Sequence, residues 1–291
     1  MTLLLLLITI LLLALLAYRA LQRALRADPF KKRFQNLYPP SKTVTWLSRQ
    51  GRRPLLAHLY QPPDWHHTDK RPCIVLFFGG AWRVGSAWQF APFAARLCAL
   101  GAVVVLPEYR IKSRDRSTVE EAVVDGFTVI DKIRQSADCL GIDLARISVG
   151  GGSAGGHLAA WIATGRHPNG SHAADGFKPS SLLLFNPAVN FPIDASAYKG
   201  YSRRQKFSAR ALAKLSALDP MLHSESGHPD TLILHGDQDQ LVPVDKVEGY
   251  AAALQKQGAA VAMTIYPGRH HAFFNQTNSL DDFESSCASL I

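Results

Sequence analysis

The feature that most constrains this chain is a regular alternation of short apolar runs with helical patterns over roughly its last 250 residues. The runs show no polar alternation, so each carries apolar side chains for both faces of a sheet, as the central strands of a helix-covered parallel sheet do. They lie at residues 73–78, 102–106, 147–149, 181–185, 231–234 and 261–265. This pattern predicts an α/β fold with a mostly parallel, doubly wound sheet and helices on both faces.

Shorter signals place further elements. Residues 43–47 and 55–60 are apolar runs separated by a turn-forming stretch, and they predict an antiparallel hairpin at the start of the sheet. Apolar residues recur every three or four positions from Val119 to Ile133, and Thr118 with Glu121 forms a capping box in front of them. Asp245 with Glu248 repeats this cap pattern before the last predicted helix.

An uncharged, leucine-rich run covers residues 3–17. A helix of this length spans about 22 Å, and the flanking residues up to Ala20 bring it close to the roughly 30 Å of a bilayer core. We predict an uncleaved membrane anchor with a basic flank at residues 1–27, a polar linker at 28–42 and a single α/β domain at 43–291. The basic residues follow the run, which predicts that this domain lies on the cytoplasmic side. The alternatives are an exported protein with a cleaved signal peptide and a soluble protein with a docked helix.

The net charge of +9 is concentrated beside this run. Residues 1–33 hold six basic residues and one acidic residue, a balance of +5, which leaves only +4 for the other 258 residues. A nucleic-acid-binding protein would instead carry its basic residues on one face of the folded domain, so we expect no nucleic-acid partner. With 47% apolar residues, the chain is not an intrinsically disordered protein either.

Four widely spaced cysteines include no C-x-x-C pair, so we expect neither a metal site nor a disulfide framework. Cys73 and Cys98 lie in apolar patterns and are predicted to be buried free thiols.

The strongest chemical signal is Gly151-Gly152-Ser153-Ala154-Gly155, which matches G-x-S-x-G. It follows the apolar run at 147–149 and opens a helical pattern, the strand–turn–helix context of a nucleophile elbow. The glycines allow close backbone approach, and the helix N-terminus favours developing negative charge. Ser153 is therefore the candidate nucleophile.

A serine nucleophile needs a base, and the base needs an orienting acid. The run at 231–234 leads to two candidate acids, Asp237 and Asp239, and the last run leads to two candidate bases, His270 and His271. The order serine, acid, histidine is the one this fold uses.

Taken together, the motifs identify a resemblance to the esterases and lipases of the α/β-hydrolase superfamily, near its hormone-sensitive-lipase-like and acetyl-xylan-esterase-like branches. The resemblance covers about residues 43–280. Its motifs are Phe77-Phe78-Gly79-Gly80-Ala81-Trp82, Glu108-Tyr109-Arg110, Leu140-Gly141-Ile142-Asp143 with Arg146-Ile147, the elbow, H-G-x-x-D-x-x-V-P from His235, and His271-Ala272-Phe273. It implies Asp239 as the acid and His271 as the base, in preference to Asp237 and His270, and it implies structural roles for His157 and His235.

The family's H-G-G-G segment reads Phe78-Gly79-Gly80-Ala81 here. An oxyanion hole uses backbone N–H groups, so loss of the histidine side chain does not abolish it. We predict the donors to be the amides of Gly79, Gly80 and Ala154, and we expect Ala81, in place of the last glycine, to tighten the loop.

Residues 190–230 are too long for a plain connection and predict a cap, with a basic stretch at 199–214. The chain is thus expected to cleave short-chain acyl esters, acetyl esters foremost, of a small-molecule substrate through an acyl-enzyme, without metal or organic cofactor. The alternatives are a peptidase or amidase on the same fold and a non-catalytic binding protein.

Overall fold

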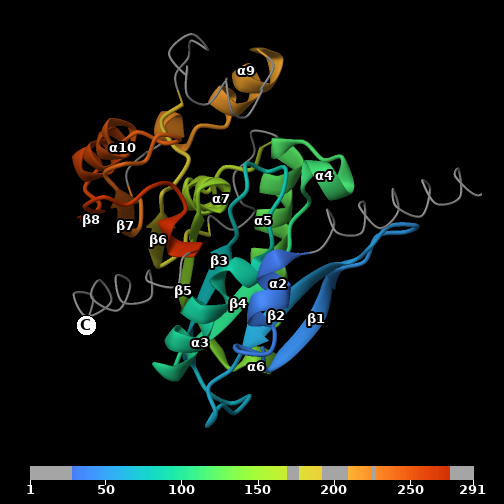
Figure 1. The fold of residues 1–291 in the computed structure, drawn as a ribbon. Helices are drawn as coiled ribbons and strands as arrows, with labels where there is room; N and C mark the ends of the chain where they lie inside the picture. The colour runs from blue at the N-terminus through green and yellow to red at the C-terminus, as the bar shows by residue number, and fades with distance from the viewer. Residues whose placement is uncertain (1–27, 169–176, 192–208, 224–226, 276–291) are drawn as a thin grey trace, which may run out of the picture.

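The computed structural model describes residues 28–168, 177–191, 209–223 and 227–275. Its centre is an eight-stranded sheet in the order β1-β2-β4-β3-β5-β6-β7-β8 (Figure 1). The strands are β1 Lys42–Leu47, β2 Leu55–Tyr60, β3 Arg71–Phe77, β4 Val103–Pro107, β5 Ile142–Gly152, β6 Ser181–Phe185, β7 Asp230–Gly236 and β8 Val261–Tyr266. β1, β2 and β4 pair antiparallel, and all pairs from β4 to β8 are parallel.

The mostly parallel α/β sheet and its opening hairpin are thus confirmed. Each predicted run coincides with a strand, except that Phe78 lies just after β3 and Ala102 just before β4, and β6 has the predicted bounds. β5 is longer at its start than predicted, because the strand begins at Ile142 and continues through Asp143 and three exposed residues, Leu144, Ala145 and Arg146, which do not form an apolar run.

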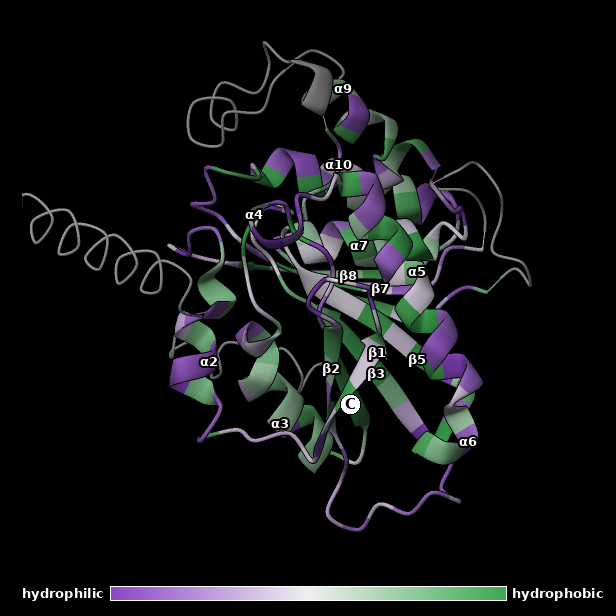
Figure 2. Cartoon of the chain, turned by 90° about the vertical axis from the view of Figure 1, so that its right-hand side faces the viewer, coloured by the Kyte–Doolittle hydropathy of each residue, from purple (hydrophilic) through white to green (hydrophobic). Residues whose placement is uncertain are grey.

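Helices cover both faces of the sheet, and Figure 2 places α3 on one side and α5 with α7 on the other. The α-helices are α2 Pro29–Phe34, α3 Ala91–Ala99, α4 Lys112–Asp115, α5 Val119–Gln135, α6 Ala137–Leu140, α7 Ala154–Ala163, α9 Ala209–Ala217 and α10 Val244–Lys256. The 3₁₀ helices are η1 Ala87–Phe90, η3 Pro220–His223 and η4 Phe273–Asn275. Buried aliphatic and aromatic side chains of the strands and of the inner helix faces form one core.

The two predicted helix caps had different outcomes. Thr118 and Glu121 form a complete capping box at the start of α5, as predicted. The cap predicted from Asp245 and Glu248 is wrong, because α10 begins at Val244 and its N-cap residue is Pro243, which makes no side-chain cap bond.

The predicted linker at 28–42 is part of the folded domain. It contains α2, and Phe34 in that helix is only 6% exposed. Phe30, Phe34 and Tyr38 recur every four residues, so their rings line one side of the segment, with neighbouring ring centroids 6.5 and 5.9 Å apart. The Tyr38 carbonyl also accepts a hydrogen bond from Tyr60 Oη at 3.0 Å. The domain therefore begins by residue 28.

Two other predictions lie mainly outside the described residues. The leucine-rich run is one, and within the described ranges no helix is long and apolar enough to cross a membrane. The predicted cap is the other. The described elements α9 and η3 belong to it, and Lys214, at the end of its basic stretch, forms an ion pair with Glu120 of α5 at 2.9 Å.

The two thiols predicted to be buried, those of Cys73 and Cys98, are buried and free.

Candidate active site

Ser153 lies in a strained turn between β5 and α7. Its φ of 52° and ψ of −113° are unusual for a non-glycine residue. A side chain at Gly151 or Gly155 would place Cβ 2.4 or 2.0 Å from the Phe77 carbonyl oxygen, so only glycine fits at either position. The turn therefore has the tight backbone of the predicted nucleophile elbow, and Ser153 stands at the carboxyl end of a central strand.

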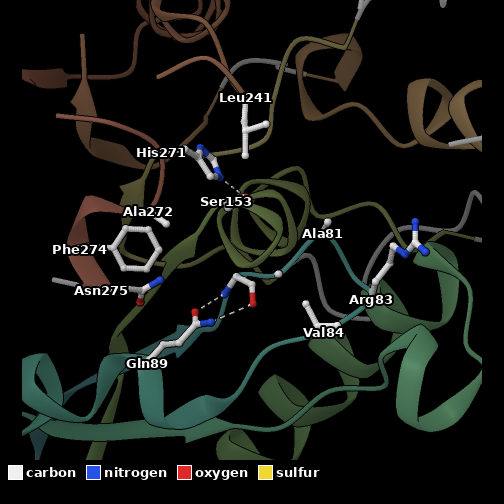
Figure 3. A pocket seen from close by; sticks show the side chains of 12 residues that line it. Ala81, Arg83, Val84, Gln89, Ser153, Leu241, His271, Ala272, Phe274 and Asn275 are labelled. Carbon is white, nitrogen blue, oxygen red and sulfur yellow. Dashed lines mark hydrogen bonds between the residues drawn. The ribbon is translucent and has the colours of Figure 1, made fainter. Parts of the chain in front are cut away.

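The structure brings the three predicted catalytic residues together, and Figure 3 shows the imidazole of His271 next to Ser153. His271 Nε2 lies 2.8 Å from Ser153 Oγ, and His271 Nδ1 lies 2.7 Å from Asp239 Oδ2. A carboxylate only accepts hydrogen bonds, so the proton of the neutral imidazole sits on Nδ1 and donates to Asp239. The Nε2 lone pair then faces the serine hydroxyl, which donates to it. This is the tautomer that a general base requires.

The other two candidates lie elsewhere. Asp237 accepts a hydrogen bond from the Gly268 amide at 2.7 Å and is exposed. His270 contacts the Gln238 carbonyl oxygen through Nδ1 at 3.0 Å and is also exposed. Both residues therefore shape the loops next to the site.

Asp239 is buried, and both of its oxygens accept hydrogen bonds. Burial raises its pKa, but the hydrogen bond and charge interaction with His271 and the bond from the Val242 amide outweigh burial, so the pKa lies below its usual range. Oδ1 accepts from the Leu241 and Val242 amides at 2.8 and 2.9 Å. A charged carboxylate whose two oxygens both accept hydrogen bonds stabilises the Nδ1-protonated tautomer of neutral His271 and also an imidazolium formed during the reaction.

Asn186, which sequence reasoning missed, holds the second oxygen of this carboxylate. Its Nδ2 donates to Asp239 Oδ2 at 3.0 Å, and the residue is fully buried at the end of β6 with a φ of 40°. The sequence did contain a signal for Asn186, because residues that directly follow parallel strands gather at one edge of the sheet, where the site lies. Asn186 comes directly after the predicted run 181–185.

The predicted oxyanion donors need one correction. The Gly79 N–H already donates to Gln89 Oε1 at 2.9 Å, so this amide is occupied. Within the described part of the chain, the amides of Gly80, Ala81 and Ala154 have no acceptor. Ala81 has a φ of 55°, which turns the loop sharply at the position where the family carries glycine. The available donors are therefore Gly80, Ala81 and Ala154.

A cavity of about 490 Å³ opens above Ser153 (Figure 3). Its walls include the 79–81 loop, Val84, Leu241, Phe274 and Asn275. The Phe274 ring stacks on Phe90, with centroids 5.2 Å apart. It fills the space beside the elbow so closely that a Cβ on Gly152 would lie 2.1 Å from it. The cavity is therefore apolar next to the serine and bounded by fixed aromatic rings.

Two histidines near the site serve the fold. His157 Nε2 contacts the Leu218 carbonyl oxygen at 2.8 Å, which ties α7 to the cap, and burial lowers its pKa to about 4. His235 Nε2 contacts the Val242 carbonyl oxygen at 2.9 Å within the loop that carries Asp239. These contacts agree with the structural roles implied by the resemblance. Among the residues that the structure describes, no cluster of three or more His, Cys, Asp or Glu could hold a metal ion.

The strand order and the serine turn define an α/β hydrolase. Residues 74–275 match a protein family described as having the alpha/beta hydrolase fold, and the chain belongs to this family. The resemblance to esterases of this superfamily is confirmed by the proteins it matches.

Esterase LipQ of Mycobacterium tuberculosis is 28% identical over 236 residues, which are 77% of this chain and 55% of that protein. A probable isoprenylcysteine α-carbonyl methylesterase of Oryza sativa is 28% identical over 233 residues, 73% of this chain and 53% of the relative. The chain thus spans about half the length of these curated relatives. A thermophilic esterase of Thermogutta terrifontis, solved with propionate bound, has 30% identity and a TM-score of 0.73, covering 87% of this chain and 92% of that one.

Proposed function

We propose that this chain is a serine carboxylic-ester hydrolase that cleaves short-chain acyl esters, acetyl esters foremost, through an acyl-enzyme. The observation that carries the proposal is the continuous Ser153–His271–Asp239 hydrogen-bonded chain, in which Ser153 and His271 line the cavity. An activated serine beside free backbone donors is the arrangement that acyl transfer requires. The esterases among the relatives support the ester as substrate class.

In the proposed acylation step, His271 Nε2 takes the Ser153 proton while Oγ attacks the ester carbonyl carbon. The carbonyl oxygen becomes an oxyanion and accepts from the amides of Gly80, Ala81 and Ala154. Asp239 stabilises the imidazolium through Nδ1. His271 then donates the proton to the alcohol oxygen as the C–O bond breaks, which leaves the acyl group on Ser153.

In the deacylation step, His271 Nε2 takes a proton from a water molecule that attacks the acyl-enzyme. The second tetrahedral intermediate uses the same amides, and its collapse releases the carboxylic acid as Oγ regains the proton. Each step needs only groups of this chain and water.

The walls of the cavity favour short acyl groups. Phe274 is 2% exposed and is held by Phe90, so it leaves little room for a long chain beside Gly152. The Thermogutta terrifontis esterase has been solved with propionate and with butyrate bound, which supports acyl groups of this size as ligands.

The test is hydrolysis of p-nitrophenyl acetate, butyrate and decanoate by the full chain and by Ser153→Ala. Ser113→Ala, which removes an exposed hydroxyl on α4, is the matched control. We expect the Ser153→Ala variant to lose about 10⁴-fold or more in turnover, the control to keep its activity, and acetate to be preferred over decanoate. Aminoacyl p-nitroanilides in parallel test the amidase alternative, which a faster anilide rate would favour. Equal ester rates with and without the Ser153 hydroxyl would refute the serine mechanism.

We further propose that residues 1–27 anchor the enzyme in a membrane with the catalytic domain on the cytoplasmic side. The support is the uncharged leucine-rich run and the basic residues that follow it. Leu6→Arg with Leu12→Arg should move the protein from the membrane fraction to the soluble fraction, since each arginine costs about 2.5–3.5 kcal/mol at the centre of a span. Membrane recovery equal to that of the wild type would refute the anchor.

A further inference from the structure

Gln89 makes an unusual pair of contacts with the loop beside Ser153. It lies in η1 and is only 5% exposed. Its Oε1 accepts from the Gly79 N–H at 2.9 Å, and its Nε2 donates to the Gly79 carbonyl oxygen at 3.3 Å (Figure 3). Only this orientation of the amide matches a donor with an acceptor at both contacts. One side chain therefore binds both polar groups of a single loop residue.

Gly79 in turn lies directly against the nucleophile turn. A Cβ on Gly79 would be 2.9 Å from the Gly152 carbonyl oxygen and 3.3 Å from Ser153 Cβ. The two residues that follow, Gly80 and Ala81, line the cavity together with Ser153. The position of these donors relative to Ser153 Oγ thus depends on how firmly Gly79 is held.

The helix that carries Gln89 is itself fixed at its start. Ser86 caps η1 by accepting from the Trp88 amide at 3.2 Å, and its hydroxyl donates to the Asp28 carboxylate. The other oxygen of Asp28 accepts from the Lys31 amide at 2.9 Å and caps α2. The N-cap residues of η1 and α2 are therefore hydrogen-bonded to each other, which fixes the start of the helix that carries Gln89.

We propose that Gln89 is a positioning residue for oxyanion stabilisation. By holding the Gly79 peptide against the nucleophile turn, it keeps the Gly80 and Ala81 amides aimed at the oxygen that becomes negative during acylation. The proposal rests on the proposed function. Its physical basis is that a donor stabilises a transition state most when it is already oriented, so that no rearrangement is needed as the charge forms.

The chemistry of the contact yields two informative substitutions. Leucine in place of Gln89 is similar in size but can neither accept from the Gly79 N–H nor donate to its carbonyl oxygen. Glutamate in its protonated form can do both, whereas an ionised glutamate can only accept and adds negative charge near the oxyanion. Burial favours the protonated form of a carboxyl group, so Gln89→Glu should regain the native contacts as the pH falls.

The experiment measures kcat and KM for p-nitrophenyl acetate with the full chain, Gln89→Leu, Gln89→Glu and the control Gln255→Leu, which changes an exposed glutamine of α10. Each variant is first checked for cooperative thermal unfolding. Removal of a whole oxyanion donor lowers kcat about 10²- to 10³-fold. Gln89→Leu keeps the donors but loosens the loop that positions them, so kcat should fall by less, about 10- to 100-fold, with little change in KM. The ratio of Gln89→Glu to wild-type kcat should be higher at about pH 5.5 than at about pH 8.5, where the carboxyl ionises more fully.

A folded Gln89→Leu variant with kcat within about threefold of wild type overturns the proposal. Should Gln89→Leu not fold, a Gln89→Glu ratio that does not rise towards acidic pH overturns it instead. Reaction of the wild type with a fluorophosphonate separates this outcome from failure of the proposed function. An unreactive wild type refutes the serine esterase itself, whereas a reactive wild type with unimpaired Gln89 variants refutes only the role of Gln89.

Discussion

Replacement of Asp239 by asparagine tests how the acid orients the base. Four donors converge on this carboxylate, namely His271 Nδ1, Asn186 Nδ2 and the amides of Leu241 and Val242. Asparagine at position 239 has only one acceptor oxygen. The Leu241 and Val242 amides cannot reorient, so this oxygen takes the place of Oδ1 and accepts their hydrogen bonds. The NH₂ group of the asparagine then takes the place of Oδ2, to which His271 and Asn186 donate in the wild type.

Both partners can rearrange, and the rearrangement inactivates the base. The Asn186 amide can flip to present Oδ1, which has no partner among the described residues, although the flip gives up the contact of Nδ2 with His235 Nδ1 at 3.4 Å. His271 can accept at Nδ1 only by moving its proton to Nε2, where it faces Ser153 and can no longer take the serine proton. We therefore expect kcat to fall about 10⁴-fold, or about 5 kcal/mol in activation free energy. The free energy of unfolding should fall by no more than about 2 kcal/mol, since few groups are left without a partner.

The assay is p-nitrophenyl acetate hydrolysis across a pH series, with urea unfolding of the same samples. Asp237→Asn is the matched control, because the exposed Asp237 carboxylate accepts a hydrogen bond from the Gly268 amide at 2.7 Å, and asparagine keeps an oxygen that can accept it. The control should stay within about twofold of wild type. An Asp239→Asn variant that keeps more than about 1% of the wild-type kcat, or a larger loss in the control, would refute this reasoning.

Three further predictions concern the pocket and the fold. Phe274→Ala should raise the decanoate-to-acetate ratio of kcat/KM about tenfold or more by opening the cavity, and an unchanged ratio would show that another wall limits the acyl chain. Ala272→Gly should raise the unfolding free energy in urea by about 0.5–1 kcal/mol, because Ala272 has a φ of 62°; a decrease would count against backbone strain there. Burial lowers the pKa of His157 and of His228 to about 4 and raises that of Asp219 to about 6. Between about pH 6.5 and 4 the unfolded chain protonates these histidines more readily than the folded chain, so the free energy of unfolding falls as the pH falls, and the raised pKa of Asp219 offsets part of this fall. The free energy of unfolding should therefore be about 2–3 kcal/mol lower at pH 5 than at pH 7. Equal values from urea titrations at the two pH values would contradict this.

Local patterns were sufficient to predict the sheet and the order of the site residues. A buried parallel strand needs apolar side chains on both faces, so the run at 181–185 predicted β6 to the residue. The turn around Ser153 needs glycines where backbones meet, and that requirement is visible in the motif itself.

Contacts between distant segments could not be predicted in this way. The contact of Gln89 with Gly79 depends on a short 3₁₀ helix that folds back on the loop, and no motif marks it. The linker prediction failed for a different reason, since the four-residue spacing of Phe30, Phe34 and Tyr38 was present in the sequence but stood among polar residues. Which amide donors remain free was likewise decided by packing around the loop.

The most direct test of the central claim is covalent labelling of Ser153. The Thermogutta terrifontis esterase has been solved phosphorylated by paraoxon, so the same reagent suits this chain. Attack of Ser153 Oγ on phosphorus should release one p-nitrophenol per chain and leave one diethylphosphoryl group, located by mass spectrometry on the peptide that contains Ser153. The Ser153→Ala variant should show neither product. Absence of the adduct in the wild type, or an equal adduct in Ser153→Ala, would contradict the account of Ser153 as an activated nucleophile.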